Sequence, residues 1–545
     1  MKAKGLLVAA TAAAALSWPA GAQGAPPPQG AAMSSNLEYI TRVADARGIT
    51  EGKFDRVRGR DVLVITGRFG FRTYDVRDAR NPRLLDSFLP ADLEQNGYWQ
   101  NEDMEIDRRR KLIIGALDPR HTEKGATATS PCPPSPPSAA NVRLTACRSG
   151  FYVISYADPR NMRQVGDFVD LPSGHTSSCI QGCRYLWTGG PARRDDQAWL
   201  GTILQPDSPF PGVPGRTVGR LVGDGRPIWV TDLRNPARPR VSNKPVDLFR
   251  NDGYTDYSHD VDEDEQGIAW VSGRGGIRGY ATRGVHRDPY ENRRRRATPF
   301  DPILVAGGGV AGTAQPVMLM HNAGRPTDRA VRASGVRRGN ILVGTEEEFT
   351  RPCEASGKII LSNLTDSWGG EPAQRSTLTR PYRMKALDTF HPFIDTPETA
   401  NPALGCSAHY FEIEDSMLAA GWYGQGLRLL DISNARNVRQ VGYFRVTGTT
   451  DAAGENPSSN SWDVEFYNDR RRGRTSGGRS NLVYLWDMNR GIEVLRIKGG
   501  AAASARMKSV VAPSVKRDRF ASKPVSSLAR ASADGGAGYV CPLFQ

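Results

Sequence analysis

One sequence pattern, repeated along the chain, constrains the fold of this protein more than any other feature. Residues 426–444 read GLRLLDISNARNVRQVGYF, and residues 71–88 (FRTYDVRDARNPRLLDSF) and 151–168 (FYVISYADPRNMRQVGDF) align with them without a gap. A repeat of this size indicates that the chain consists of copies of one small unit. Such a unit cannot bury its hydrophobic surface alone and must stack on its neighbours.

Each unit is expected to contain four short strands. In residues 409–444 the segments HYFEIE and LRLLDIS alternate polar and apolar residues, MLAAGWY is apolar, and VRQVGYF ends the unit. The period of two residues predicts strands rather than helices, and Gly, Asn, Asp and Pro supply the turns between them. The 58 glycines and 38 prolines of the 545-residue chain fit a fold with many turns and few long helices.

Seven such units can be traced between residues 37 and 498. The seventh lacks its fourth strand, whereas a strand-like segment, LEYITRVA at 37–44, precedes the first unit without belonging to it. Both facts are explained if the N-terminal segment completes the last unit, because the units then close into a ring without a long exposed sheet edge. We therefore predict an all-β fold, a seven-bladed β-propeller whose N-terminal strand closes the last blade.

The repeats also resemble those of a known family. LRLLDISNARNVRQVGYF, FRTYDVRDARNPRLLDSF and HDVDEDEQGIAWVSG (259–273) are similar to the LVIVD repeats of bacterial and archaeal secreted or surface propellers. The resemblance covers most of residues 37–498 and implies the propeller fold, but it implies little about activity. The fourth and fifth units depart from the pattern, since their third strands lack its D-x-S/R-N-P/A ending and carry insertions.

The two ends of the chain differ in composition from the repeats. Residues 1–22 combine a basic start, a short apolar run and the small-residue exit Ala20-Gly21-Ala22, which is typical of a signal peptide cleaved near Ala22. Residues 23–36 are interpreted as a linker and residues 499–545 as a basic low-complexity tail. No later segment approaches 18 apolar residues, so we predict no membrane span and expect a secreted protein, or one in the periplasm or cell envelope.

Export would place the seven cysteines in an oxidising compartment, where disulfides are expected. The candidate pairs, which bracket one loop or join neighbouring loops, are Cys132–Cys147, Cys179–Cys183 and Cys353–Cys406, with Cys541 left over. The sequence does not fix this connectivity.

The formal net charge of +14 raises the question of a nucleic-acid partner. Two basic segments stand out, the C-terminal tail and ENRRRRATPF (291–300), and neither is accompanied by a recognition helix or a base-stacking motif. We therefore predict no nucleic-acid binding and interpret these segments as solvated loops that can contact an anionic cell surface.

The candidate site emerges when the first strands of the units are aligned. The aligned opening positions are Phe54, Glu102, His175, His259, His321, His409 and Trp462, so four of the seven histidines share one repeat position. The first strand of a propeller blade lines the central channel, so these side chains should converge there. Four imidazoles beside the Glu102 carboxylate form a candidate site for a divalent metal, with Cu or Zn favoured by the imidazole donors.

Two functions remain open at this point. In the first, the histidines hydrogen-bond to neighbouring blades and hold the ring together. The protein then binds a protein or glycan ligand at the cell surface through its insertions, 118–148, 190–226, 281–300 and 445–460. In the second, the histidines bind the metal and the protein is a metal-dependent enzyme, an oxidase or a hydrolase. We predict no specific catalytic residue.

Several other polar and aromatic residues are assigned structural roles. We expect Glu346–Glu348 to be a solvated strand end, His391 to be a loop histidine and Trp462 to pack between blades. Asp260 and Asp262 lack the glycine spacing of an EF-hand, which argues against a calcium loop there.

Overall fold

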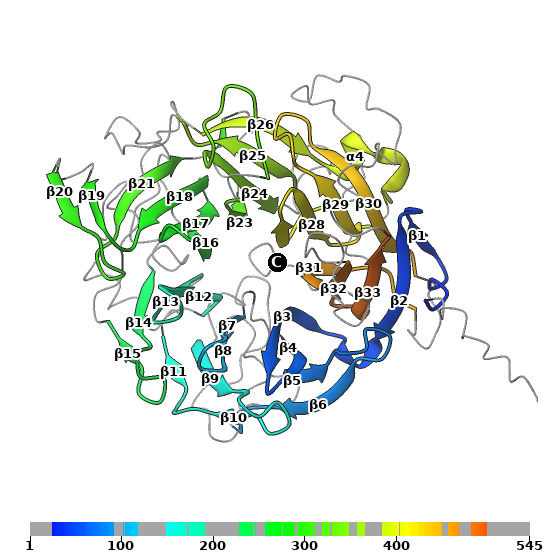
Figure 1. Ribbon diagram of the computed structural model, residues 1–545, viewed down its shortest axis with the longest axis horizontal. Helices are drawn as coiled ribbons and strands as arrows, with labels where there is room; N and C mark the ends of the chain where they lie inside the picture. The colour runs from blue at the N-terminus through cyan, green and yellow to red at the C-terminus, as the bar shows by residue number, and fades with distance from the viewer. Residues whose placement is uncertain are drawn as a thin grey trace, which may run out of the picture.

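The structure is a computed structural model in which seven antiparallel sheets surround a central axis (Figure 1). It describes residues 24–91, 102, 104–117, 149–171, 174–190, 228–242, 246, 257–274, 276–288, 291, 293–308, 310–311, 319–326, 330–347, 357–365, 384–402, 404–448, 456–467 and 481–498. The predicted all-β, seven-bladed propeller is confirmed.

Each blade consists of four main strands that follow one another from the axis outward. Blade 1 contains β3 (Ile49–Val57), β4 (Arg60–Gly67), β5 (Gly70–Asp75) and β6 (Arg83–Phe88). Blade 2 contains β7 (Glu105–Asp107), β8 (Leu112–Leu117) and β9 (Gly150–Ser155), with β10 (Arg163–Gln164) and β11 (Val169–Asp170) at its edge. Blade 3 contains β12 (Thr176–Ile180), β13 (Tyr185–Gly189), β14 (Trp229–Asp232) and β15 (Arg240–Val241).

The remaining blades repeat this order. Blade 4 contains β16 (Tyr257–Glu263), β17 (Ile268–Arg274), β18 (Gly276–Ala281) and β21 (Ile303–Gly308). Blade 5 contains β23 (Leu319–Gly324), β24 (Ile341–Glu347), β25 (Ile359–Asn363) and β26 (Met384–Phe390). Blade 6 contains β27 (Phe411–Glu414), β28 (Met417–Trp422), β29 (Gly426–Asp431) and β30 (Arg439–Val446). Blade 7 contains β31 (Ser461–Tyr467), β32 (Leu482–Asp487), β33 (Gly491–Ile497) and β2 (Leu37–Val43).

Short elements decorate the ring. The hairpin of β19 (Val285–Asp288) and β20 (Arg293–Arg296) projects beside blade 4, within the 281–300 insertion (Figure 1). The others are β22 (Val310–Ala311), parallel to β26, and the helical turns η1 (Ala44–Ala46), α4 (Pro392–Asp395) and η6 (Pro397–Thr399). Among the described residues, no helix has the length and apolar character needed to cross a bilayer.

The ring closes as the sequence predicts. Strand β2 pairs antiparallel with β33, and Leu37 lies opposite Ile497 while Val43 lies opposite Ile492. In Figure 1 the blue β2 therefore runs beside the orange-red β33. The N-terminal strand thus covers the sheet edge that blade 7 would otherwise expose.

Two strand assignments differ from the sequence analysis. Residues interpreted as a linker include β1 (Ala31–Met33), which pairs with the outer edge of blade 6 and places Ala31 opposite Val446. The outer segment of blade 2, RQVGDF, does not form one continuous strand, since β10 and β11 pair separately with β9. The short, divided edge limits the backbone available for pairing with another chain.

The core lies between adjacent blades. The residues Leu63, Ile65, Tyr484 and Trp486, for example, pack together between blades 1 and 7. Six tryptophan side chains are fully buried in the ring, namely Trp187, Trp229, Trp270, Trp422, Trp462 and Trp486. Burial of this apolar surface is the main favourable term that holds blades together.

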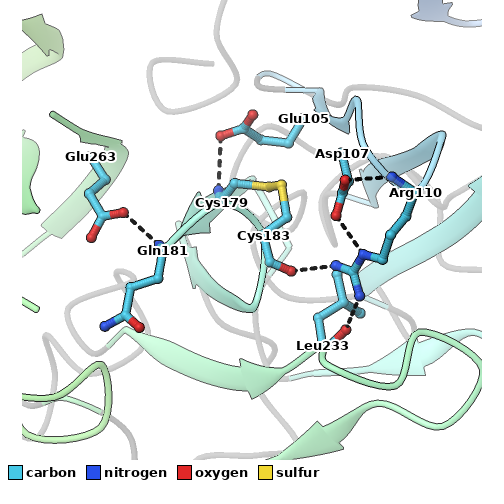
Figure 2. The surroundings of a disulfide bond; sticks show 8 residues. All are labelled: Glu105, Asp107, Arg110, Cys179, Gln181, Cys183, Leu233 and Glu263. Carbon is cyan, nitrogen blue, oxygen red and sulfur yellow. Dashed lines mark hydrogen bonds and ion pairs between the residues drawn. A yellow bond between two sulfur atoms is a disulfide. The ribbon is translucent and has the colours of Figure 1, made fainter. Parts of the chain in front are cut away.

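A disulfide links Cys179 to Cys183 in the turn between β12 and β13 (Figure 2), as one of the candidate pairs predicts. The Cys179 amide donates a hydrogen bond to Glu105 Oε1 of blade 2 at 2.9 Å, and the Gln181 amide donates to Glu263 of blade 4 at 2.5 Å. This turn therefore connects three blades. Cys406 is also disulfide-bonded, whereas Cys132, Cys147, Cys353 and Cys541 lie outside the described residues.

Candidate metal centre

The inner strands carry β-bulges close to their first residues. The register of β16 shifts between Ser258 and Asp260, and that of β31 shifts between Ser461 and Asp463, so His259 and Trp462 are the extra residues. A bulge leaves its extra residue outside the ladder and can re-aim its side chain. The same shift in β23 spans His321.

Blade 1 has its bulge at Thr50, because the register of β3 shifts between Ile49 and Glu51. The equivalent of the histidines in blade 1 is therefore Thr50, and the alignment of Phe54 with them is wrong. Phe54 lies further along β3 and stacks on Tyr467 with a ring-centroid distance of 4.4 Å.

Four imidazoles and one carboxylate meet near the axis of the ring. The histidines come from four successive blades, 3 to 6, and Glu102 lies just before the first strand of blade 2. All five side chains are fully buried. The distances from Glu102 Oε2 to the Nε2 atoms are 3.2 Å for His321, 3.6 Å for His409, 3.8 Å for His175 and 3.9 Å for His259. These five residues are called the histidine cluster below.

The imidazole rings follow one another around the axis. Their centroids lie 4.6 Å apart for His175 and His259, 4.1 Å for His259 and His321, and 3.9 Å for His321 and His409. The Nε2 atoms of His175 and His259 are 3.0 Å apart. Gly190 leaves room for this arrangement, because a Cβ on Gly190 would lie 2.0 Å from His175 Cβ.

Backbone contacts fix the orientation of two of the rings. His259 Nδ1 lies 3.0 Å from the His321 carbonyl oxygen, and His409 Nδ1 lies 2.7 Å from the Trp462 carbonyl oxygen. A carbonyl oxygen only accepts, so each Nδ1 carries the proton and the neutral ring turns the lone pair of Nε2 inward. The same contact orients metal-binding histidines in proteins.

Burial also favours the neutral form of the imidazoles. Loss of solvent lowers the pKa of His409 well below its ordinary value, and the nearby His175 acts in the same direction. Burial lowers the pKa of His321 in the same way, with further contributions from the three other imidazoles of the cluster. A neutral imidazole is the form that binds a metal ion.

His409 Nε2 has an environment that hydrogen bonds do not explain. It is buried and has no hydrogen-bond partner among the residues that the structure describes. Its nearest charged neighbours are Glu102 Oε2 at 3.6 Å and Glu347 Oε1 at 3.8 Å. A nitrogen lone pair therefore faces two carboxylate oxygens, an arrangement that a cation between them would stabilise.

The structure adds Glu347 to this site, and the sequence analysis missed it. Glu346 and Glu347 are 3% and 0% exposed, so the expectation of a solvated strand end is wrong for both. Glu347 ends β24, accepts a 2.5 Å hydrogen bond from the Tyr423 hydroxyl and lies 3.9 Å from His321 Nε2. Only first strands were compared in the alignment, whereas Glu347 reaches the site from a second strand.

The spacing of the donor atoms is compatible with one ion. Ligand atoms about 2.1 Å from a metal lie roughly 3.0 Å apart at right angles and roughly 3.4 Å apart in a tetrahedron. Three sets of three donors have their ligand atoms within 4.8 Å of one another, namely Glu102–His321–His409, Glu102–His175–His259 and His259–His321–Glu347. Imidazole-rich donor sets suit Zn, Cu, Fe or Ni rather than Mg or Ca.

The other residues weighed in the sequence analysis lie outside this donor set. Trp462 is buried and tilts over His409 with a centroid distance of 4.1 Å, so it forms part of the wall. His391 is buried away from the axis, where it caps α4 by accepting a hydrogen bond from the Phe393 amide. His286 lies in β19, and His121 is outside the described residues.

Comparisons with known proteins identify no family for this chain. No protein-family model and no curated protein matches this chain. Among solved structures, the extracellular domain of a protein named as a hybrid two-component system (BT4673) from B. thetaiotaomicron has a TM-score of 0.42 and 12% identity, and the match covers 84% of this chain but only 39% of the other. The β-propeller domain of Myceliophteria thermophila Cps50 (Swd1) has a TM-score of 0.40 and 10% identity, over 85% of this chain and 99% of the other. These similarities concern the fold alone.

Proposed function

We propose that this protein is an exported propeller of the LVIVD type whose functional centre is one divalent transition-metal ion on the ring axis. His175, His259, His321 and His409 provide the nitrogen ligands. Glu102 is the carboxylate ligand, and Glu347, held by Tyr423, completes the charge balance. Two buried carboxylates, four neutral imidazoles and a divalent ion carry no net charge together, which lowers the cost of burying them.

The observation that carries this proposal is the inward lone pair of His409 Nε2. It faces carboxylate oxygens at 3.6 and 3.8 Å, and hydrogen bonds among the described residues do not account for it. The structural role considered for the histidines is compatible with the metal. Nδ1 of His259 and of His409 bonds to the next blade. Nε2 of His409 is then available to the ion, and Nε2 of His259 can bind it in place of its 3.0 Å hydrogen bond with His175 Nε2.

Metal content tests the proposal directly. Protein purified without a His-tag should contain about one Zn, Cu, Fe or Ni ion per chain by elemental analysis. His259→Ala should lose the ion and keep the β-sheet circular dichroism spectrum. His391→Ala is the matched control, because it removes a buried histidine that lies outside the cluster, and it should keep the ion. A folded wild-type protein that binds no ion after metal reconstitution contradicts the proposal.

We infer that the ion acts on a small molecule, as a metal-dependent oxidase or hydrolase requires. Four imidazoles and Glu102 leave room for one further ligand in a six-coordinate ion. Azide added to the Co²⁺-loaded protein tests this, because binding at an open position changes the visible absorption spectrum. An unchanged spectrum at saturating azide contradicts the enzyme role.

The second candidate is a binding protein in which the ion is purely structural. The complete burial of every ligand side chain favours it. Recognition of a protein or glycan would then use the insertions, of which the structure describes the β19–β20 hairpin with its exposed Arg287, Arg294 and Arg296. The azide experiment separates the two candidates. Export is supported in both by the Cys179–Cys183 disulfide.

A further inference from the structure

A second set of charged residues lines the inner strands beyond the histidine cluster. It consists of seven carboxyl side chains from five blades, and the mechanism proposed above does not use them. We call this set the acidic vestibule, and its members are Glu51 on β3, Glu105 on β7, Asp260 and Asp262 on β16, Glu412 on β27, and Asp463 and Glu465 on β31.

Several of these carboxyl groups interact electrostatically between blades. Asp260 of blade 4 interacts electrostatically with Glu105 of blade 2 and Glu51 of blade 1. Glu412 of blade 6 interacts with Glu465 of blade 7. The innermost strands of these blades surround the centre of the ring in Figure 1.

The lysine side chain of Lys53 on β3 lies close to several of them. The Lys53 ammonium forms a 2.8 Å ion pair with Glu51 Oε1 and also interacts with Glu465 and Asp463. Burial disfavours the charged form of Lys53, but these carboxylates outweigh it and raise the pKa of Lys53 well above its ordinary value. The Lys53 ammonium therefore offsets part of the negative charge of these groups.

Solvent access increases along the strands away from the histidines. His259 is 0% exposed and Asp260 is 5% exposed, whereas the Asp262 side chain is exposed to solvent. On β3 the side-chain exposure is 2% for Glu51 and 28% for Lys53. Burial raises the pKa of Asp262 to about 7, and Glu105 adds to the increase. The side chains further from the histidines are therefore the more accessible to solvent.

Asp260 supplies an independent indication of a ligand. Its Oδ1 atom is buried and has no hydrogen-bond partner in the described part of the chain. It follows His259 directly and interacts electrostatically with Asp262, Glu105 and Glu51. Burial of a carboxyl oxygen without a hydrogen-bond donor costs free energy, and a cation bound next to the oxygen would lower that cost.

We propose that the acidic vestibule is the passage by which a divalent transition-metal cation reaches the histidine cluster from solvent. This inference rests on the proposed function. Among the described residues, sets of three ligand atoms within 4.8 Å occur only in the cluster with Glu347, so the vestibule attracts the ion without chelating it tightly. Weak binding at successive sites is what allows an ion to move onward. Lys53 limits the attraction.

Association kinetics of Co²⁺ with metal-free protein test the passage. The Asp262→Asn/Glu465→Gln double variant should bind Co²⁺ about tenfold more slowly than wild type at low salt, because steering by charge changes on-rates by about 10–10³-fold. Lys53→Gln should bind it faster. Asp158→Asn is the control, since it removes a carboxylate that is 42% exposed and pairs with Arg58 on the outside of the sheets.

The salt dependence distinguishes steering from damage. The differences in Co²⁺ association rate between the variants and wild type should be large at about 0.01 M salt, where the Debye length is ~30 Å. They should be small at about 1 M salt, where the Debye length is ~3 Å. All variants should still bind one Co²⁺ per chain at saturation. If the double variant, Lys53→Gln and wild type bind Co²⁺ at equal rates, the proposed passage is wrong. It is also wrong if the double variant no longer binds Co²⁺ at saturation. A wild-type protein that binds no Co²⁺ instead refutes the proposed function.

Discussion

The propeller has two buried regions of opposite chemistry. Between blades, layers made mainly of Leu, Ile, Val and aromatic side chains pack together, as around Trp486. At the axis, imidazoles and carboxylates are buried just as completely. Apolar packing stabilises a fold, whereas uncompensated polar burial destabilises it. The comparison indicates that the apolar layers between the blades provide the stability and that the buried polar groups at the axis oppose it.

Strand β31 contributes side chains to both of these buried regions. Val464 and Phe466 belong to the apolar core shared by blades 6 and 7. Asp463 and Glu465, which alternate with them, interact with Lys53 at the axis. A one-residue change of register would exchange the two sets, so the bulge between Ser461 and Asp463 determines which side chains reach the site.

Removal of the closing strand β2 should have the largest effect on the stability of the ring. A chain that begins at Asp45 lacks β2 and exposes the edge of β33, so we expect no cooperative thermal unfolding by circular dichroism. A chain that begins at Ser34 lacks β1 but retains β2, and it should unfold cooperatively close to the full-length temperature. Two equally stable truncations would show that closure does not hold the ring together.

A cavity in the apolar region should destabilise the fold without affecting the axis. Trp486→Ala removes a fully buried side chain, so the free energy of unfolding should fall by about 3–5 kcal/mol in denaturant titrations. Metal content per folded chain should stay at the wild-type value. A loss below about 1 kcal/mol would argue that the blades do not depend on this layer.

Removal of the metal should show how much the bound ion contributes to the stability of the folded protein. A ligand present at 100 times its Kd stabilises the folded state by about 2.7 kcal/mol, so chelation should lower the unfolding temperature of the wild type. His259→Ala should unfold at a temperature that does not respond to the chelator. If both proteins respond equally, the stabilising ion lies elsewhere.

His391 is a buried histidine away from the axis and can be compared with the four histidines of the cluster. Its Nδ1 accepts from the Phe393 amide and its Nε2 donates to the Cys406 carbonyl, so its hydrogen bonds are complete. Burial lowers the pKa of His391 to about 3, so the unfolded chain binds a proton that the folded chain excludes. The stabilisation is complete above about pH 6.5 and is lost as the pH falls towards 3.

The wild type should therefore lose about 1.4 kcal/mol more than His391→Gln for each pH unit below about 6.5. Denaturant titrations at pH 7 and near 5.5 measure the difference. Parallel pH profiles for the two proteins would mean that the His391 imidazole titrates normally in the folded state.

The sequence predicts the ring and much of the site for one physical reason. In a closed repeat fold, a repeated sequence position is also a repeated spatial position, so His175, His259, His321 and His409 could be expected to converge. The structure does bring them together with Glu102. That they bind a metal stays a prediction.

The parts that the sequence did not predict have identifiable causes. A β-bulge adds a residue to one strand only, and the bulge at Thr50 made Phe54 look equivalent to the histidines. Glu347 reaches the site from a second strand, so its burial depends on how β23 and β24 pair rather than on any repeat position. The strand β1 has too few residues to be recognised by alternation.

The most direct test of the metal centre is the X-ray absorption spectrum of protein purified without a His-tag. We expect one Zn, Cu, Fe or Ni ion per chain with several imidazole nitrogens at about 2.0–2.1 Å, and a loss of the imidazole signal in His409→Ala. The absence of any bound ion after reconstitution, or an all-oxygen shell that His409→Ala leaves unchanged, would contradict the account.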